Sequence, residues 1–403
     1  MFGVMSDRPW ITIVGLGEDG PDGLPPASLA ALKSADVVMG AKRHLTLLPE
    51  VAAARVEWPV PFADGIDVLK GMRGQSVVVL ASGDPFWFGA GSVIAREFKP
   101  GEWVALPAPS CFALAASRMG WALEHTVCLG LHAQDFSLVR PYLGANLRVL
   151  ITVRDGPAVG QFADYLAAVG FADSKLTVLQ ALGGPREAAE VLIAGAVTET
   201  TFTHPVCIAV EPAGEGDELP LSSGLPDRLF ASDGVMTKRA VRAVTLSSLA
   251  PKRGEVLWDI GGGSGTIGIE WMLAHSSCRA IAIEPRADRV ALIRENAKAL
   301  GTPQLDVLHG SAPDCLAELP APDAVFIGGG LSADMLATLR AMLPAGVRIV
   351  ANAVTLEAEA LLIEAQKTHG GELIQLSVSE ADALGDKTGW KPARPIVQWA
   401  GSL

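Results

Sequence analysis

The chain has 403 residues, enough for two or three domains, and 49% of them are hydrophobic, enough to fill large cores. Its 32 basic and 44 acidic residues give a formal net charge of −12, and no block of basic residues interrupts the sequence. This pattern excludes a broad nucleic-acid-binding surface. It also means that a polyanionic ligand would need a local cluster of Arg and Lys.

The first half of the chain alternates short β-type runs with helical patterns. Strands are predicted at 11–16, 37–39, 76–81, 147–152, 175–179 and 207–210, and helices at 29–34, 155–170 and 184–192. The run at 76–81 is apolar without alternation, which is typical of a strand buried on both faces. This half is therefore expected to be an α/β domain, with two subdomains.

Residues 212–228 are rich in Gly, Pro and acidic residues and show no periodicity. We interpret this segment as a linker between a first domain, residues 1–211, and a second, residues 229–403. The alternative is a long surface loop within one domain.

The second half shows the regular β-α alternation of a doubly wound sheet with one nucleotide-type crevice. Strands are predicted at 255–260, 280–284, 305–308, 323–327, 347–351 and 395–399, and helices at 238–249, 266–274, 287–300 and 333–342.

A glycine cluster follows the first strand of the second half. The strand ends in Asp259, and Gly261, Gly263 and Gly265 follow before the next helix; the second strand ends in Glu284. Glycines let the backbone pass close to a ligand beside a helix N-terminus, and Glu284 can accept hydrogen bonds from both ribose hydroxyls. The acids suit the cation S-adenosylmethionine at least as well as NAD. Taken alone, the glycines could also form a tight turn without function.

Three loops of the first half carry similar signals. The first strand ends in Gly15-Leu16-Gly17. Residues 82–91, with the motif Ser-Gly-Asp-Pro, follow the buried strand, and the third loop is 107–110. Asp84 lies where α/β proteins bind ligands, at the carboxyl end of a strand. The alternative is that Asp84 only caps the local turn.

These loops resemble those of the tetrapyrrole (corrin and porphyrin) methylase family. The matches are VGLG at 14–17, ASGDPFWFG at 81–89 and PS at 109–110. The second half resembles a small class I methyltransferase of late corrin synthesis, in GVMTK at 234–238, WDIGGGSG at 258–265, Glu284, GSAP at 310–313 and NAVTLE at 352–357. Glu18 departs from the family pattern because many members have Pro there, and Ala-Pro-Ser-Cys at 108–111 replaces the more usual Gly-x-Ser-Ser.

The resemblance implies a tetrapyrrole-methylase (class III) fold of two α/β subdomains, followed by a Rossmann-like class I methyltransferase domain with a doubly wound sheet. It also implies two S-adenosylmethionine sites. In the first half it assigns to the cofactor Gly15, Leu16, Gly17, Gly83, Asp84, Phe88, Gly89 and Ser110. In the second half it assigns Thr237, Asp259, Gly261, Gly263, Gly265, Glu284, Ser311 and Ala312.

The order of the two halves resembles the fused decarboxylating methyltransferases of vitamin B12 biosynthesis. This implies methylation of precorrin-6B at carbons 5 and 15, with loss of carbon dioxide from the ring C acetate, to give precorrin-8. In-line methyl transfer needs placement and exclusion of water more than acid–base groups. Candidate catalytic residues are Lys238 and Asp233 before the glycine cluster, and His132 in the first half. Lys238 could instead be part of a solvated helical turn, and His132 a structural side chain.

Two other functions stay open. An NAD-dependent oxidoreductase would need a glycine at the sixth position of its loop motif, where Thr266 stands. A non-catalytic, two-domain ligand-binding protein is the second alternative.

The cysteine and histidine patterns indicate the cellular compartment of the protein and whether it binds a metal. The five cysteines stand at 111, 128, 207, 278 and 315 without CxxC spacing, and the seven histidines show no metal-ligand spacing. Met1–Trp10 lacks the apolar stretch of a signal peptide, and no run reaches the ~20 apolar residues of a membrane helix. We therefore expect a cytoplasmic protein with free thiols, and without metal, membrane or nucleic-acid partners. We also expect it to form a homo-oligomer.

Overall fold

The structure is a computed structural model, which describes residues 9–50, 52–198 and 201–402. The chain divides into two compact units. Unit 1 comprises residues 1–136 and 142–217, and unit 2 comprises residues 137–141 and 218–403. The main boundary lies within the segment 212–228. No helix among the described residues is long and apolar enough to span a membrane.

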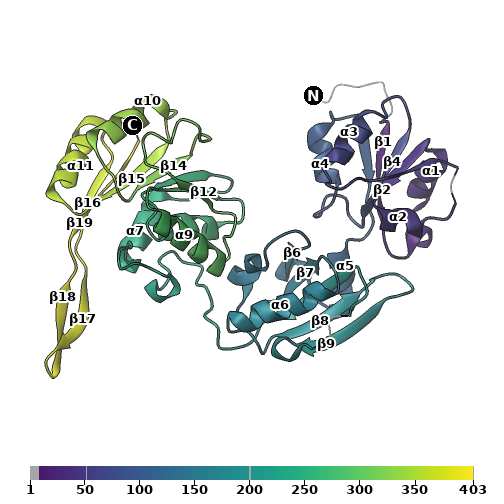
Figure 1. The fold of residues 1–403 in the computed structure, drawn as a ribbon, viewed down its shortest axis with the longest axis horizontal. Helices are drawn as coiled ribbons and strands as arrows, with labels where there is room; N and C mark the ends of the chain where they lie inside the picture. The colour runs from purple at the N-terminus through teal and green to yellow at the C-terminus, as the bar shows by residue number, and fades with distance from the viewer. Residues whose placement is uncertain (1–8, 51, 199–200, 403) are drawn as a thin grey trace. The chain divides into compact units, whose positions relative to one another are not determined.

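The first sheet of unit 1 is parallel. Its order is β3 (Ala54–Glu57), β2 (Val37–Gly40), β4 (Val77–Ser82), β1 (Ile11–Leu16) and β5 (Trp103–Leu106). Helices α1 (Pro26–Ser34) and α2 (Lys42–Leu47) lie on one side of it, and α3 (Asp64–Lys70) and α4 (Gly91–Glu97) on the other (Figure 1). Two apolar clusters fill the space between sheet and helices, which explains why β1 and β4 are apolar without alternation.

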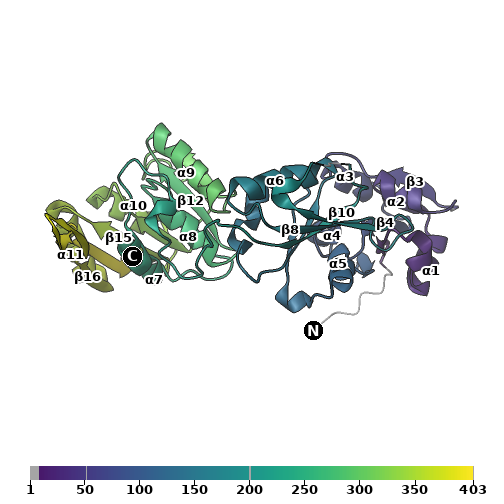
Figure 2. The same cartoon turned by 90° about the horizontal axis from the view of Figure 1, so that it is seen from below.

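The second sheet of unit 1 is mixed. Its order is β6 (Val127–Gly130), β7 (Val149–Val153), β10 (Val206–Glu211), β8 (Lys175–Gln180) and β9 (Ala188–Ile193), and only the β6–β7 pair is parallel. Helices α5 (Cys111–Met119) and α6 (Pro157–Ala168) lie on opposite faces (Figure 2).

The predicted helix at 184–192 is wrong, because most of that segment is the edge strand β9. Nearly all its side chains are exposed, so it has no buried apolar stripe of the kind that holds a surface helix in place. The ladder with β8 supplies its backbone hydrogen bonds instead.

Unit 2 contains a seven-stranded sheet. Its order is β13 (Asp306–His309), β12 (Arg279–Glu284), β11 (Val256–Ile260), β14 (Ala324–Ile327), β15 (Arg348–Ala353), β19 (Ile396–Gly401) and β16 (Glu372–Leu376). The strands from β13 to β15 are parallel, and β19 is antiparallel to both its neighbours. The strand order reverses at β11, and this places a ligand crevice at the carboxyl ends of β11 and β14.

Helices cover both faces of this sheet. One apolar cluster packs α7 (Arg239–Leu249), α8 (Thr266–Ala274) and α9 (Ala287–Ala299) on one face, and another packs α10 (Ala333–Met342) and α11 (Leu356–His369) on the other. The predicted strands and helices of this half agree with the structure to within two residues.

The sequence did not predict the hairpin of β17 (Ser379–Leu384) and β18 (Lys387–Pro392). These strands pair only with each other and stand away from the seven-stranded sheet (Figure 1). Leu384 and Trp390 are largely exposed, so the usual alternation of buried and polar positions is missing.

Candidate functional sites

A cavity of about 900 Å³ opens at the carboxyl ends of the central strands of unit 2. Gly261, directly after β11, has a φ of +76°, and a Cβ added there would lie 2.7 Å from the backbone nitrogen of Gly329. The glycine therefore lets the loop after β11 approach the loop after β14, and both loops line the cavity.

Two buried acids lie in this cavity. Glu284 accepts hydrogen bonds from the backbone nitrogens of Gly263 (2.9 Å) and Arg286 (3.0 Å), and Asp259 accepts one from Gly268 (2.9 Å) in the first turn of α8. Burial, with a smaller contribution from the nearby charge of Glu284, raises the pKa of Asp259 to about 7, although the hydrogen bond from Gly268 opposes the rise. The pair favours a ligand that carries positive charge.

Most of the residues predicted to bind cofactor in unit 2 line this cavity. They are Thr237, Asp259, Gly261, Gly263, Glu284, Ser311 and Ala312. Gly265 is not among the lining residues; its backbone, with a φ of +77°, precedes α8 and packs close to Ile293. The sequence did not single out Ser264, whose buried hydroxyl has no hydrogen-bond partner among the described residues. Such an unpaired group in the glycine loop fits a polar ligand.

The two predicted catalytic residues of unit 2 have different surroundings. Lys238 lines the cavity, and its ammonium lies 3.9 Å from a carboxylate oxygen of Asp227. Asp233 is not among the lining residues. Its carboxylate accepts a hydrogen bond from Arg289 (2.9 Å), which chiefly lowers its pKa.

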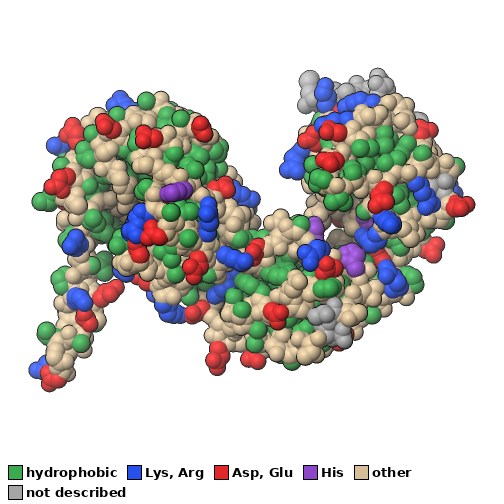
Figure 3. Space-filling model, viewed as in Figure 1, with side chains coloured by type: hydrophobic (Ala, Val, Ile, Leu, Met, Phe, Trp, Pro, Cys, Tyr) green, Lys and Arg blue, Asp and Glu red, His purple; other side chains and the backbone are tan. Residues whose placement is uncertain are grey.

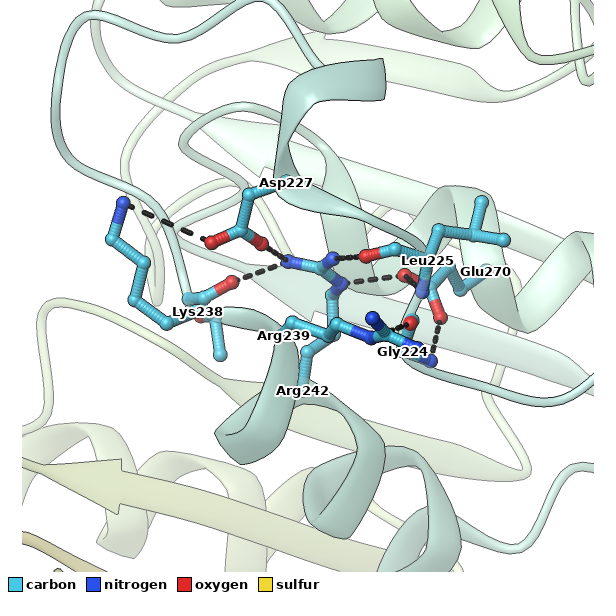
Figure 4. Close-up of polar contacts among 8 residues, drawn as sticks. Gly224, Leu225, Asp227, Lys238, Arg239, Arg242 and Glu270 are labelled. Carbon is cyan, nitrogen blue, oxygen red and sulfur yellow. Dashed lines mark hydrogen bonds and ion pairs between the residues drawn. The ribbon is translucent and has the colours of Figure 1, made fainter. Parts of the chain in front are cut away.

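A buried arginine, Arg242, fixes the segment before α7 that contains Thr237 and Lys238 and lines the cavity (Figure 4). The fully buried guanidinium of Arg242 donates to Asp227 (3.1 Å) and to the carbonyl of Thr237 (2.5 Å). It also donates to Glu270 and to the carbonyl of Leu225. This network joins α7, α8 and the segment before α7.

Glu270 completes this network. Its carboxylate accepts the backbone N–H groups of Gly224 (2.6 Å) and Leu225 (3.0 Å), and Arg239 donates to the carbonyl of Gly224 (2.9 Å). Sequence reasoning missed this network because Arg242 and Glu270 lie on different helices, 28 residues apart.

Five basic side chains also line the cavity of unit 2. They are Lys238, Arg286, Arg289, Lys391 and Arg394. They come from three separate parts of the sequence, so no run of basic residues predicts that they lie together. The fold thus brings basic side chains from distant parts of the sequence to one cavity, which acidic residues also line.

A second cavity, of about 790 Å³, lies within unit 1 and is lined by residues of both its sheets. The three predicted loops meet beside it. A Cβ added to Gly15 would lie 1.8 Å from the carbonyl oxygen of Gly83 and 2.6 Å from the backbone nitrogen of Ala108. Only a glycine at position 15 allows the loops to pack this closely.

The predicted cofactor residues of unit 1 fall into two groups. Those that line the cavity are Leu16, Gly17, Gly83, Phe88, Gly89 and Ser110, and the catalytic candidate His132 lines it too. Gly15 and Asp84 are not among the lining residues. Asp84 accepts a hydrogen bond from the backbone nitrogen of Phe86 (2.9 Å), the turn-capping role that was the alternative interpretation. Ser110 caps α5 by accepting from Ala113 (3.1 Å).

A polar cluster that sequence reasoning missed lies at this cavity. The buried Glu18 forms ion pairs with Arg43 and Arg186 (2.8 Å for the latter), joining the loop after β1 to the segment after β8. Arg43 donates to the Ser82 hydroxyl (2.8 Å), which lies 2.9 Å from Nε2 of His44. Burial and the charge of Arg43 lower the pKa of His44 to about 3, so its imidazole is neutral.

Comparison with known families defines the class of protein first. Residues 11–195 match the family described as Tetrapyrrole (Corrin/Porphyrin) Methylases, and residues 228–402 match a Precorrin methyltransferase domain. The fold and these matches define an S-adenosylmethionine-dependent methyltransferase with two α/β domains.

Individual relatives narrow the assignment. The Precorrin-6Y C(5,15)-methyltransferase [decarboxylating] of Sinorhizobium sp is 47% identical over 398 residues, which cover 97% of this chain and 96% of that protein. The chain belongs to the family of these decarboxylating precorrin-6Y C(5,15)-methyltransferases.

Two shorter relatives also match. One is named Probable cobalt-precorrin-6B C(15)-methyltransferase (decarboxylating), from Pyrobaculum calidifontis, and is 37% identical over 182 residues, 43% of this chain and 92% of that protein. The other is the crystal structure of the C-terminal domain of precorrin-6Y C5,15-methyltransferase from Rhodobacter capsulatus. It is 49% identical, covers 46% of this chain and 100% of that chain, and has a TM-score of 0.45.

These matches confirm the predicted family, the fold class and decarboxylating methyltransferase activity. They do not favour the NAD-dependent oxidoreductase or the non-catalytic alternative.

Proposed function

We propose that each unit binds its own S-adenosylmethionine, and that the chain methylates precorrin-6B at carbons 5 and 15 and removes the ring C acetate carboxyl. The observation that carries this proposal is the pair of separate glycine-lined cavities, each at the carboxyl ends of strands of its own unit. Each cavity has the volume of a small-molecule site.

We assign methylation of carbon 15 and decarboxylation to unit 2, and methylation of carbon 5 to unit 1. The resemblance of the second half to a small class I methyltransferase supports this division. The Pyrobaculum relative supports it too, because a protein that aligns over only 182 residues is named for both the C(15) methylation and the decarboxylation.

The residues of the unit 2 cavity fit this cofactor. Glu284, at the end of β12, is placed to accept hydrogen bonds from ribose hydroxyls, and the hydroxyl of Ser264 can donate to a polar group of the ligand. Asp259, when ionised, stabilises positive charge nearby. When bound, S-adenosylmethionine supplies an electrophilic methyl group. The chain contributes alignment at a distance of roughly 3–3.5 Å between the reacting atoms, and exclusion of water.

Three residues serve the substrate in this scheme. Lys238, which lines the unit 2 cavity, binds a peripheral carboxylate of the tetrapyrrole, and His132 faces the macrocycle in unit 1. Asp233 orients Arg289 and does not touch the substrate itself. Decarboxylation takes its electron sink from the conjugated ring, so the protein has to place the acetate and return a proton.

The test uses two variants of the full chain with precorrin-6B and S-adenosylmethionine. Gly15→Val places a side chain against the carbonyl of Gly83 and disrupts the loop packing beside the unit 1 cavity. Gly261→Val does so against Gly329, in a loop that lines the unit 2 cavity. Mass spectrometry should find one added methyl group in each product, with loss of carbon dioxide only for Gly15→Val. Loss of both reactions in both variants, or decarboxylation by Gly261→Val, would contradict the division.

A further inference from the structure

The five basic side chains of the unit 2 cavity differ in how they are paired. Four have acidic partners: Arg286 with Asp288 (2.5 Å), Arg289 with Asp233 (2.8 Å), Lys391 with Asp382 (2.8 Å) and, more loosely, Lys238 with Asp227 (3.9 Å). Arg394 lines the same cavity and has no acidic partner among the described residues. Its charge is therefore available to a ligand.

The backbone of Arg394 is fixed although its side chain is exposed. The residue lies between β18 and β19, at the base of the hairpin. The preceding Ala393 donates to the carbonyl of Val378 (2.8 Å), which closes this base, and Pro395 restricts Arg394 to an extended conformation. Two residues later the chain enters β19, which pairs with β15 and β16. The guanidinium thus extends from an anchored point beside the cavity.

The rest of the hairpin is close to neutral. Figure 3 shows basic and acidic side chains next to one another along it. Lys391 bonds to Asp382 and lies across the ladder from Glu380, so its charge is already balanced. Arg394 lies outside the ladder, and its cation is not balanced in this way.

A tetrapyrrole with acetate and propionate arms is a polyanion, and a protein with a net charge of −12 repels it. Productive binding then requires local cations, and a guanidinium can hold a carboxylate through two parallel hydrogen bonds. We propose that Arg394 is a specificity-determining residue that binds a peripheral carboxylate of the tetrapyrrole and holds the macrocycle at the unit 2 cavity. This inference rests on the proposed function.

The experiment compares Arg394→Gln with Lys387→Gln in the full chain. Lys387 begins β18 on the same hairpin, is exposed and does not line the cavity, so the two variants lose the same charge. Tetrapyrrole binding is titrated by absorbance in the presence of S-adenosylhomocysteine, and the KM and kcat of decarboxylation are measured separately.

We expect Arg394→Gln to weaken tetrapyrrole binding and raise KM by about tenfold to a hundredfold, the range for a lost charge-assisted hydrogen bond. The value of kcat and the affinity for S-adenosylmethionine should stay near those of the unchanged chain. Lys387→Gln should behave like the unchanged chain, and Arg394→Lys should recover part of the loss. A tetrapyrrole with esterified carboxylates should bind the unchanged chain and Arg394→Gln equally.

Unchanged tetrapyrrole affinity in Arg394→Gln would overturn the assignment, and so would an equal loss in Lys387→Gln. A parallel fall in S-adenosylmethionine affinity would also overturn it, because it would make Arg394 a cofactor or structural residue. Failure of the proposed function itself looks different: the unchanged chain would then not decarboxylate precorrin-6B.

Discussion

The two cavities lie at similar places in their units, at the carboxyl ends of strands, but their linings differ in charge and in loop packing. In unit 2, the buried acids Asp259 and Glu284 accompany the glycine loop, and basic side chains line the same cavity. In unit 1, three loops pack backbone against backbone, His44 is neutral, and the buried charge of Glu18 is balanced by two arginines. We infer that charge recognises the cofactor in unit 2, and that loop shape does so in unit 1.

The largest expected effect is the loss of folding stability when a buried ion pair is broken in each unit. Replacing the fully buried Arg242 by Met removes the cation that pairs with the buried Glu270, which should cost about 3–5 kcal/mol of folding stability. Hydrogen exchange should show the loss in α7 and α8 and leave unit 1 unchanged. Glu18→Gln in unit 1 should cost less, because the side chains of Arg43 and Arg186 are 28% and 54% exposed. Equal losses of folding stability from the two substitutions would contradict this difference between the units.

The next effect concerns Glu284. Glu284→Ala removes the carboxylate proposed to hold the ribose and should weaken cofactor binding in unit 2 by about tenfold to a hundredfold, or roughly 1.5–3 kcal/mol. Glu284→Gln keeps one acceptor oxygen, so its cofactor affinity should lie between those of the unchanged chain and Glu284→Ala. Glu295→Ala, at an exposed position of α9, is the control. Calorimetry that finds unchanged affinity for Glu284→Ala would show that the cofactor lies elsewhere.

A smaller effect is the pH dependence of unit 2. Because the folded pKa of Asp259, about 7, lies above its ordinary value of 3.8, the stability it contributes is present below pH 4 and is lost as pH rises through 7. A cationic ligand favours the ionised form, so S-adenosylmethionine affinity in unit 2 should increase severalfold between pH 6 and pH 8. Calorimetry at both pH values measures this. Asp259→Asn should remove the dependence, and a dependence that survives would have another source.

The smallest effect concerns Asp84. Since its carboxylate caps a turn and does not line the cavity, Asp84→Ala should weaken cofactor binding in unit 1 only a few fold, by loosening the loop. Asp84→Asn keeps an acceptor oxygen and should bind normally. A loss as large as that expected for Glu284→Ala would mean that a carboxylate, and not loop shape, recognises the cofactor in unit 1 as well.

The features that could be predicted from the sequence are those whose residues lie close together along the chain. The glycine loop, its flanking strands and Glu284 are neighbours in sequence or are joined by a regular strand–helix–strand unit, so pattern alone located them. Arg242 with Glu270, and Glu18 with Arg186, meet only through packing, and residues 28 and 168 positions apart carry no local signal. The strand β9 was mispredicted because it is an exposed edge, where side-chain pattern says little about backbone conformation.

The most direct test of the central claim is the number and character of the S-adenosylmethionine sites in the full chain. Calorimetry should find two sites per chain, one of which strengthens from pH 6 to pH 8 while the other does not. Gly15→Val should remove the pH-independent site, and Gly261→Val the pH-dependent one. A single site in the unchanged chain, or the loss of both sites in one of these variants, would contradict the account of two independent methyltransferase units.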